Sequence, residues 1–348
     1  MKIKFYLIII LFLIFGCENE KNKIFIEKIG YVTLNNPLII APMAGVTNAA
    51  FRELCLEFGA GLVCCEMVSD KAIYYKNEKT AKMIDVGFGH PVSLQLFGSD
   101  PKTMAYATRV LDKDSECDII DINMGCPVTK VIKTGAGSAL MKDEDLALEI
   151  VKSVLDNTSK PVTVKMRLGY DMQHKNYMSL AKKLEHTGIK AITLHGRTRS
   201  QMYEGKANWD EIKLLHENIS IPVIGNGDIK ILDDYIKYKE YCDALMVGRG
   251  IIGNPFLIKE ISDYEKGITD IKTSYKDRIE MCLRHAHKLC TLKGEIIGIR
   301  EMRGLAPHYI SGLYNSSVYK NRMSKLETYD DLNNLLREYE TLLDNQEI

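Results

Sequence analysis

The chain has 348 residues, which is long enough for one large α/β domain with a smaller domain beside it. Its 46 basic and 46 acidic residues balance, so the overall charge selects neither nucleic acid nor membrane, and any basic surface must be local. The nine cysteines are an odd number without paired C-x-x-C spacing. This pattern argues against disulfides, zinc and iron–sulfur clusters, favours a reducing compartment, and predicts no metal site.

The N-terminus does not fit a reducing compartment. Two lysines precede an apolar stretch at residues 5–15, and Cys17 follows a glycine. Such a stretch is too short to span a bilayer but is typical of a secretory leader, and Cys17 resembles a lipoprotein cleavage site. The alternative is a start codon assigned too early, because the regular pattern begins only near Ile26. We favour the alternative, so we set residues 1–25 apart as a leader of doubtful status and expect a cytoplasmic protein without stable membrane association.

Short apolar or β-branched runs then recur along the chain, and stretches with helical periodicity, such as residues 145–156 and 177–186, separate most of them. Strands that alternate with helices imply parallel pairing through right-handed crossovers. Eight such units ending near Asn254 fit a closed (β/α)8 TIM barrel better than an open sheet. The runs cover residues 38–43, 62–67, 91–97, 119–123, 162–167, 191–195, 221–225 and 244–247.

The character of the sequence changes after the eighth run. No further strand pattern appears, and residues 277–291 and 330–343 show helical periodicity. Residues 276–325 carry ten lysines and arginines against four acidic residues, with tyrosines between them. A stretch of this kind is often only a solvated surface, but it is also a candidate for RNA contact. We therefore expect a barrel domain at residues 26–254 and a smaller all-helical domain at residues 255–348.

Polar or glycine-rich groups end almost every one of the eight runs. In a barrel these ends converge on one face, where such folds carry their active sites. Cys126 follows a buried run within the segment Asn-Met-Gly-Cys-Pro, so we expect its thiol to act on a substrate. The alternative for a lone cysteine is a small apolar residue in a turn.

The loops after the seventh and eighth runs are candidates for a phosphate site. Residues 225–228 and 247–250 combine glycines, which let backbone N–H groups approach an anion, with the bidentate donor Arg249. Loops at these positions are the usual phosphate site of barrel enzymes. His195 ends the sixth run and is a further donor to a phosphate or ring, although a core histidine is equally common.

Other strand ends suit a flat heterocycle. Residues 42–44 offer backbone and an apolar methionine to a ring, and Gln95 offers an amide to a ring edge; as alternatives, Met43 is a core residue and Gln95 a satisfied polar one. Lys165 lies between apolar residues and needs a negative partner. A reduced flavin would provide one, and a salt bridge to Glu66 is the alternative.

Five motifs together resemble the tRNA-dihydrouridine synthases, and most closely their B-type bacterial branch. The resemblance implies FMN in a barrel, NADPH as electron donor, and reduction of the C5–C6 double bond of a uridine in the tRNA D-loop. It also implies a helical C-terminal domain that binds the RNA, and no protein partner. The motifs lie at residues 41–47, 123–128, 135–140, 194–199 and 225–229, and the likeness runs from about Lys28 to Tyr314.

The resemblance also assigns roles to single residues. Cys126 is the expected proton donor, and Asn123, Arg167 and Tyr203 are the expected contacts of the uracil. One departure concerns the RNA: the family pattern has a basic pair and an aromatic segment where Arg303 is followed by Gly-Leu-Ala-Pro. The residues expected to hold FMN are Pro42, Met43, Ala44, Gln95, Lys165, His195, Asn226, Gly227, Asp228, Gly248 and Arg249.

Two other classes of protein share part of this pattern. A barrel flavoprotein of the dihydropyrimidine or dihydroorotate dehydrogenase type has the same phosphate loops and in some cases a cysteine near the fourth strand. It gives no reason for a basic helical domain. A catalytically silent RNA-binding protein would yield colourless material, whereas a bound flavin would make the preparation yellow.

Overall fold

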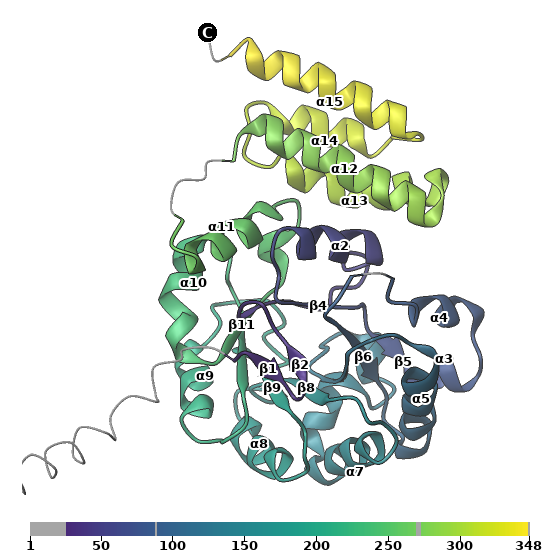
Figure 1. Ribbon diagram of the computed structural model, residues 1–348, viewed down its shortest axis with the longest axis vertical. Coiled ribbons are helices and arrows are strands. Elements are labelled where there is room, and N and C mark those ends of the chain that lie inside the picture. Colours follow the sequence, from purple (N-terminus) through teal and green to yellow (C-terminus); the bar gives the residue numbers. More distant parts are fainter. Residues whose placement is uncertain (1–25, 88, 269–272, 347–348) are drawn as a thin grey trace, which may run out of the picture.

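The structure, a computed structural model, describes residues 26–87, 89–268 and 273–346. The expected leader lies outside the described residues. Eight parallel strands form a closed barrel in which β11 pairs with β3 and β4 pairs with β6 (Figure 1). Each of the eight predicted runs overlaps one of these strands, so the TIM-barrel prediction is confirmed. The strands are β3 (Leu38–Ile40), β4 (Leu62–Cys64), β6 (Val92–Phe97), β7 (Ile119–Met124), β8 (Val162–Arg167), β9 (Ala191–His195), β10 (Val223–Asn226) and β11 (Ala244–Val247).

Helices surround the barrel, and their ends carry ordinary capping signals. Asp100 caps α5 and is followed by proline at the first helical position, and Asp143 caps α7 by accepting from the N–H of Leu146. The predicted helices at residues 145–156 and 177–186 are α7 and α8. These outer helices are α2 (Ala49–Glu57), α3 (Asp70–Tyr74), α4 (Glu78–Met83), α5 (Pro101–Asp114), α6 (Thr129–Ile132), α7 (Glu144–Leu155), α8 (Tyr177–Glu185), α9 (Trp209–His216), α10 (Leu232–Tyr238) and α11 (Phe256–Glu265).

The barrel interior is apolar at one end and polar at the other. A short antiparallel hairpin, β1 (Lys28–Ile29) with β2 (Val32–Thr33), closes the N-terminal end of the barrel. Its apolar side chains form one buried cluster with residues near the starts of the strands, such as Ile119 and Ile224. The polar strand-end residues lie at the opposite end. This arrangement leaves the C-terminal end of the barrel as the open face.

The C-terminal part of the chain is a bundle of four described helices, α12 (Tyr275–Lys293), α13 (Glu295–Tyr309), α14 (Ser316–Met323) and α15 (Tyr329–Asp344). The two predicted helices lie within α12 and α15, which both begin with a capping box. The sequence pattern did not reveal α13, because Gly298 and Pro307 ordinarily disfavour a helix interior. Gly298 is needed there, since a Cβ would lie 2.8 Å from the Cα of Cys290 on α12.

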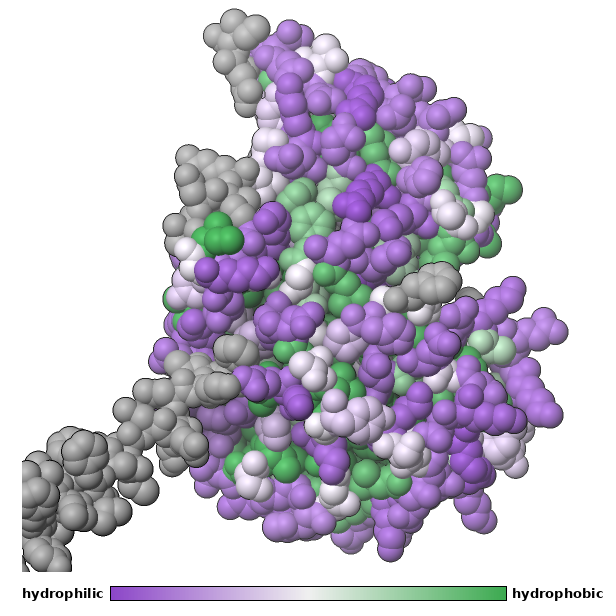
Figure 2. Space-filling model, viewed as in Figure 1, coloured by the Kyte–Doolittle hydropathy of each residue, from purple (hydrophilic) through white to green (hydrophobic). Residues whose placement is uncertain are grey.

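The bundle lies on α2 of the barrel (Figure 1). Leu54 of α2 belongs to the bundle's buried cluster, and Lys288 of α12 pairs with Glu53 of α2 at 2.7 Å. In contrast, the buried residues of α11 pack with the barrel core, so the expected boundary at residue 255 precedes a helix that still covers the barrel. The face seen in Figure 2 is mainly hydrophilic over both regions. Among the described helices, none has the length and apolar character needed to cross a lipid bilayer.

Candidate functional site

A cavity of about 380 Å³ lies among the loops that follow the barrel strands, a volume that suits a cofactor or substrate. All fifteen site residues predicted from the sequence line it. Six of them lie within strands: Gln95 on β6, Asn123 on β7, Lys165 and Arg167 on β8, His195 on β9, and Asn226 on β10. The others lie in the loops that follow the strands: Pro42, Met43 and Ala44 after β3, Cys126 after β7, Tyr203 after β9, Gly227 and Asp228 after β10, and Gly248 and Arg249 after β11.

Hydrogen bonds hold the backbone of Cys126 on both sides. The Asn123 Oδ1 atom accepts from the N–H groups of Gly125 and Cys126, at 3.1 and 2.8 Å. The Cys126 carbonyl accepts from the Ser138 N–H at 3.1 Å and from its Oγ at 2.8 Å. The glycine-rich segment 135–140 therefore supports the cysteine loop, and Gly137 adopts a positive φ of 62° within it. Because the Asn123 amide serves this loop, much of its hydrogen-bonding capacity is used within the protein.

The Cys126 thiol is almost buried, with 8% of the residue exposed. Burial raises the pKa of the thiol, against smaller lowering effects of the Val128 N–H and of the nearby Arg167 and Lys165. The sulfur is therefore a protonated thiol at neutral pH. The two cations would stabilise a thiolate formed after proton loss.

Arg167 is a buried clamp between loops. Its Nε donates to the Gly125 carbonyl at 2.8 Å, and its Nη1 donates to the carbonyls of Thr198 and Met202, also at 2.8 Å. Burial lowers the pKa of the guanidinium to about 10, so it stays charged at neutral pH. Nη2 makes no hydrogen bond among the described residues and remains available to a ligand.

Lys165 reaches Asn226 and not Glu66. Its Nζ donates to Asn226 Oδ1 at 3.1 Å, while the Asn226 amide nitrogen donates to the Met246 carbonyl at 2.7 Å. Glu66 instead accepts from the Gly45 N–H at 2.9 Å and fixes the β3 loop. Burial and the neighbouring guanidinium of Arg167 lower the pKa of Lys165 to about 8. The amine thus lacks a directly bonded carboxylate within the described part of the chain.

His195 is a neutral imidazole. Burial, and then the cations Lys165, Arg167, Arg197 and Arg249, hold its pKa well below the ordinary value. Its Nε2 lies 3.4 Å from Nη1 of Arg197, which can only donate. Nε2 is therefore the acceptor, and the ring proton is on Nδ1.

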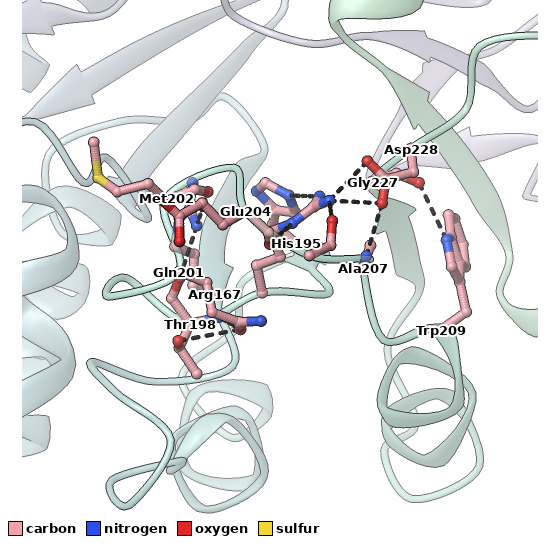
Figure 3. Close-up of polar contacts among 12 residues, drawn as sticks. Arg167, His195, Thr198, Gln201, Met202, Glu204, Ala207, Trp209, Gly227 and Asp228 are labelled. Atoms are coloured by element: carbon pink, nitrogen blue, oxygen red, sulfur yellow. Dashed lines mark hydrogen bonds and ion pairs between the residues drawn. The ribbon is translucent and has the colours of Figure 1, made fainter.

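Asp228 has protein partners of its own. Both carboxylate oxygens accept from Nη2 of the buried Arg197, at 2.9 and 2.7 Å, and Oδ2 also accepts from the Ala207 N–H (Figure 3). Although burial acts to raise the pKa of Asp228, these bonds hold it below its ordinary value. The Gly227 carbonyl accepts from Trp209 Nε1 at 3.1 Å. Asp228 thus shapes the loop after β10 and has less capacity left for a ligand than predicted.

Arg249 and Tyr203 lie together at the cavity. The guanidinium of Arg249 is 4.3 Å from the centre of the Tyr203 ring. The guanidinium of Arg167 is 5.8 Å from the centre of the same ring. Arg249 is exposed and forms no ion pair with the described residues. An anionic ligand would complete its bonding.

Sequence reasoning missed three residues that shape the cavity. Arg197 links the loops after β9 and β10, Met67 contacts the Asn123 amide through its sulfur, and Asp121 accepts from Gln95 Nε2 at 2.6 Å. The signal for Arg197 was its position in the segment His-Gly-Arg, which ends the sixth run. The signal for Asp121 was its position two residues before Asn123, on the same face of β7. The described residues hold no group of three or more His, Cys, Asp or Glu side chains arranged for a metal ion.

Half of the ten basic residues in the stretch 276–325 are neutralised within the protein. Lys276, Arg284, Lys288, Lys293 and Arg322 each pair with a carboxylate. Two further side chains bond backbone carbonyls: Arg278 to those of residues 309 and 311, and Arg303 to that of residue 326. The basic surface available to a partner is therefore smaller than the composition indicates.

Comparisons with known proteins show which family this chain resembles. Residues 39–347 match the dihydrouridine synthase (Dus) family. The chain is 40% identical to tRNA-dihydrouridine synthase B of Vibrio cholerae over 90% of this chain and 98% of that one. It is 38% identical to a probable tRNA-dihydrouridine synthase of Rickettsia bellii over 92% and 99% of the two chains.

A solved structure with low sequence identity shares the fold. Histamine dehydrogenase from Rhizobium sp. 4-9 superposes with a TM-score of 0.51 at 14% identity, over 80% of this chain and 50% of that one. This likeness supports the barrel architecture.

Proposed function

Since this chain belongs to the dihydrouridine synthase family, we propose that it is a tRNA-dihydrouridine synthase. In this proposal it reduces the C5–C6 double bond of a D-loop uridine in tRNA, with FMN as cofactor, NADPH as electron donor and the cytoplasm as its location. The names of its relatives support the activity on tRNA. The single observation that carries the chemistry is that a protonated thiol and several cations line one cavity at the barrel's open face.

The residues of the cavity fit FMN. Within the described residues, the amine of Lys165 and the guanidinium of Arg249 lack a carboxylate partner in the same cavity, as an anionic cofactor requires. Gly227 has a φ of 139°, and a Cβ there would lie 2.5 Å from that of Ala207, so only glycine permits the close backbone approach. We propose that Gly227, Gly248, Arg249 and the Nδ1–H of His195 hold the phosphate.

The flat part of the cofactor would lie against the strand ends on the other side of the cavity. We propose that Pro42, Met43 and Ala44 contact the ring, and that Gln95 bonds its edge. Lys165, oriented by Asn226, would face its pyrimidine end, while Asp228 would shape the phosphate loop through Arg197. When bound, the flavin supplies a hydride to C6 of the uracil.

The protein's own part in the reaction is proton delivery and positioning. The Cys126 Sγ–H bond breaks and its proton goes to C5, which leaves a thiolate beside Lys165 and Arg167. The free Nη2 of Arg167 would stabilise negative charge on a uracil carbonyl, and Tyr203 and Asn123 would border the base. The uridine must leave its stack to enter the cavity, at a cost of a few kcal/mol.

The variant Cys126→Ala tests this proposal. We expect it to bind FMN and to be reduced by NADPH at the normal rate, but to oxidise slowly when mixed with tRNA that lacks dihydrouridine. Cys290→Ala is the matched control, because Cys290 is a partly exposed thiol on α12, outside the cavity. Near-normal single-turnover product formation by Cys126→Ala would remove the thiol from its role.

The choice of electron acceptor separates this proposal from a free-pyrimidine enzyme. We expect unmodified tRNA to reoxidise the reduced protein, and free uracil or orotate to leave it reduced. Rapid reoxidation by orotate or uracil would overturn the assignment of tRNA as substrate. A colourless preparation that binds no added FMN would overturn the enzyme assignment altogether.

A further inference from the structure

Asp121 is a buried carboxylate to which the proposed chemistry gives no task. It lies on β7 two residues before Asn123, so both side chains face the barrel interior. Only 5% of the residue is exposed. Thr163 Oγ1 donates to Oδ1 at 2.6 Å, and Gln95 Nε2 donates to Oδ2 at 2.6 Å. Both carboxylate oxygens are therefore occupied by donors from the neighbouring strands β8 and β6.

A chain of hydrogen bonds leads from Asp121 to the cysteine loop. The Gln95 Oε1 atom accepts from Asn123 Nδ2 at 2.7 Å, and Asn123 Oδ1 accepts from the Cys126 N–H at 2.8 Å. Gln95 donates through its amide nitrogen to Asp121 and accepts through its amide oxygen from Asn123. Asn123 likewise donates through its nitrogen to Gln95 and accepts through its oxygen from the Cys126 N–H. Burial raises the pKa of the Asp121 carboxyl, against smaller lowering effects of its bonds from Thr163 and Gln95 and of Lys165. Its Oδ2 is the acceptor toward Gln95, so Gln95 presents its nitrogen to Asp121. The oxygen of Gln95 then faces Asn123, which directs the Asn123 oxygen to Cys126.

We propose that Asp121 is a positioning residue that fixes the orientation of the Gln95 and Asn123 amides and thereby the position of the Cys126 loop. Its catalytic meaning rests on the proposed function, whereas the positioning itself is a property of the chain. Asparagine at this position can still accept from Gln95 through its oxygen and donate to the hydroxyl of Thr163. Alanine cannot, and it leaves Gln95 Nε2 without its acceptor.

The test is alkylation of Cys126 by iodoacetamide in the purified protein, followed by peptide mass spectrometry. Loss of the acceptor frees the loop, so we expect Cys126 to react about tenfold faster in Asp121→Ala, and within about twofold of the original rate in Asp121→Asn. Cys242 and Cys282 are buried elsewhere and serve as internal controls in every sample. If Asp121→Ala does not fold, Gln95→Leu breaks the same chain and must show the same acceleration.

Several outcomes would overturn the proposal. These are unchanged reactivity of Cys126 in Asp121→Ala, equal acceleration of all cysteines, or an asparagine variant that behaves like alanine. A second measurement uses single turnover with tRNA, where Asp121→Ala should slow oxidation about tenfold in the original protein but not in a Cys126→Ala background. If alkylation changes as expected while tRNA is never reduced, the positioning role stands and the proposed function fails.

Discussion

Nε of Arg167 donates to the carbonyl oxygen of Gly125 at 2.8 Å, which ties the end of β8 to the residue before Cys126. An arginine expected to contact the substrate thus also determines where the thiol lies. Its remaining bonds, to the carbonyls of Thr198 and Met202, extend the link to the loop after β9.

We expect Arg167→Met to destabilise the protein by about 2–4 kcal/mol, because three backbone carbonyls, one buried and two partly buried, lose a charged donor. Urea denaturation followed by circular dichroism measures the free energy of unfolding. Arg249→Met is the matched control: its guanidinium is exposed and lacks a hydrogen-bond partner in the described structure, so we expect a change within about 0.5 kcal/mol. Equal stability of the two variants would contradict the clamp.

Asp228→Ala should cost about 3 kcal/mol of stability, because it leaves the buried charge of Arg197 without its carboxylate. The double variant Arg197→Met/Asp228→Ala should recover part of that loss. A double-mutant cycle on unfolding free energies measures the coupling. Additive single effects would show that the pair does not hold the loop after β10.

The affinity of the FMN-free protein for FMN should depend on pH through Lys165. Burial and then Arg167 lower the pKa of this lysine to about 8, so its charge is present below that pH and is lost above it. Affinity should therefore fall as the pH rises through about 8. Fluorescence titration measures it, and Lys165→Met should bind weakly with no such pH dependence. A full pH dependence in Lys165→Met would assign the effect to another group.

His285 should make the fold less stable in acid. The residue is 1% exposed, its Nε2 has no hydrogen-bond partner within the described ranges, and burial lowers the pKa to about 4. The unfolded chain therefore binds a proton that the native state excludes, and stability falls as pH drops below the ordinary histidine value of 6.5. Between neutral pH and pH 5 the loss is about 2 kcal/mol.

His285→Gln should flatten that part of the dependence in urea titrations at the two pH values. His174→Gln is the control, because the His174 side chain is 77% exposed. A pH slope that is the same in all three proteins would show that His285 does not contribute.

The features that could be predicted from the sequence are those that depend on neighbouring residues in the chain. Eight apolar runs predicted the barrel strands because both faces of each strand are buried, and the polar ends placed fifteen residues at one cavity. The hairpin β1–β2 escaped notice, since strands of two residues carry no periodicity. The helix α13 was missed because Gly298 is needed by α12, a contact that no local pattern contains.

Hydrogen bonds and ion pairs between residues far apart in the sequence could not be predicted from local patterns. The family resemblance predicted Asp228 as an FMN contact, but its protein partner Arg197 lies 31 positions earlier in the chain, where local sequence does not reveal it. Asp121 was read as part of a buried strand, and only the neighbouring strands β6 and β8 show what its carboxylate does. Sequence spacing identified the residues at the cavity, but three-dimensional register determined their bonding.

The hairpin β1–β2 covers the N-terminal end of the barrel. Side chains of Ile29 and Val32 occupy that end, so reactants enter and leave through the rim where Cys126 lies. Under the proposed function, a nicotinamide and a flipped nucleobase would use this same rim, and we expect them to bind in turn. Steady-state kinetics in which the concentrations of NADPH and tRNA are both varied should give parallel double-reciprocal lines. Intersecting lines would mean that the protein binds NADPH and tRNA at the same time.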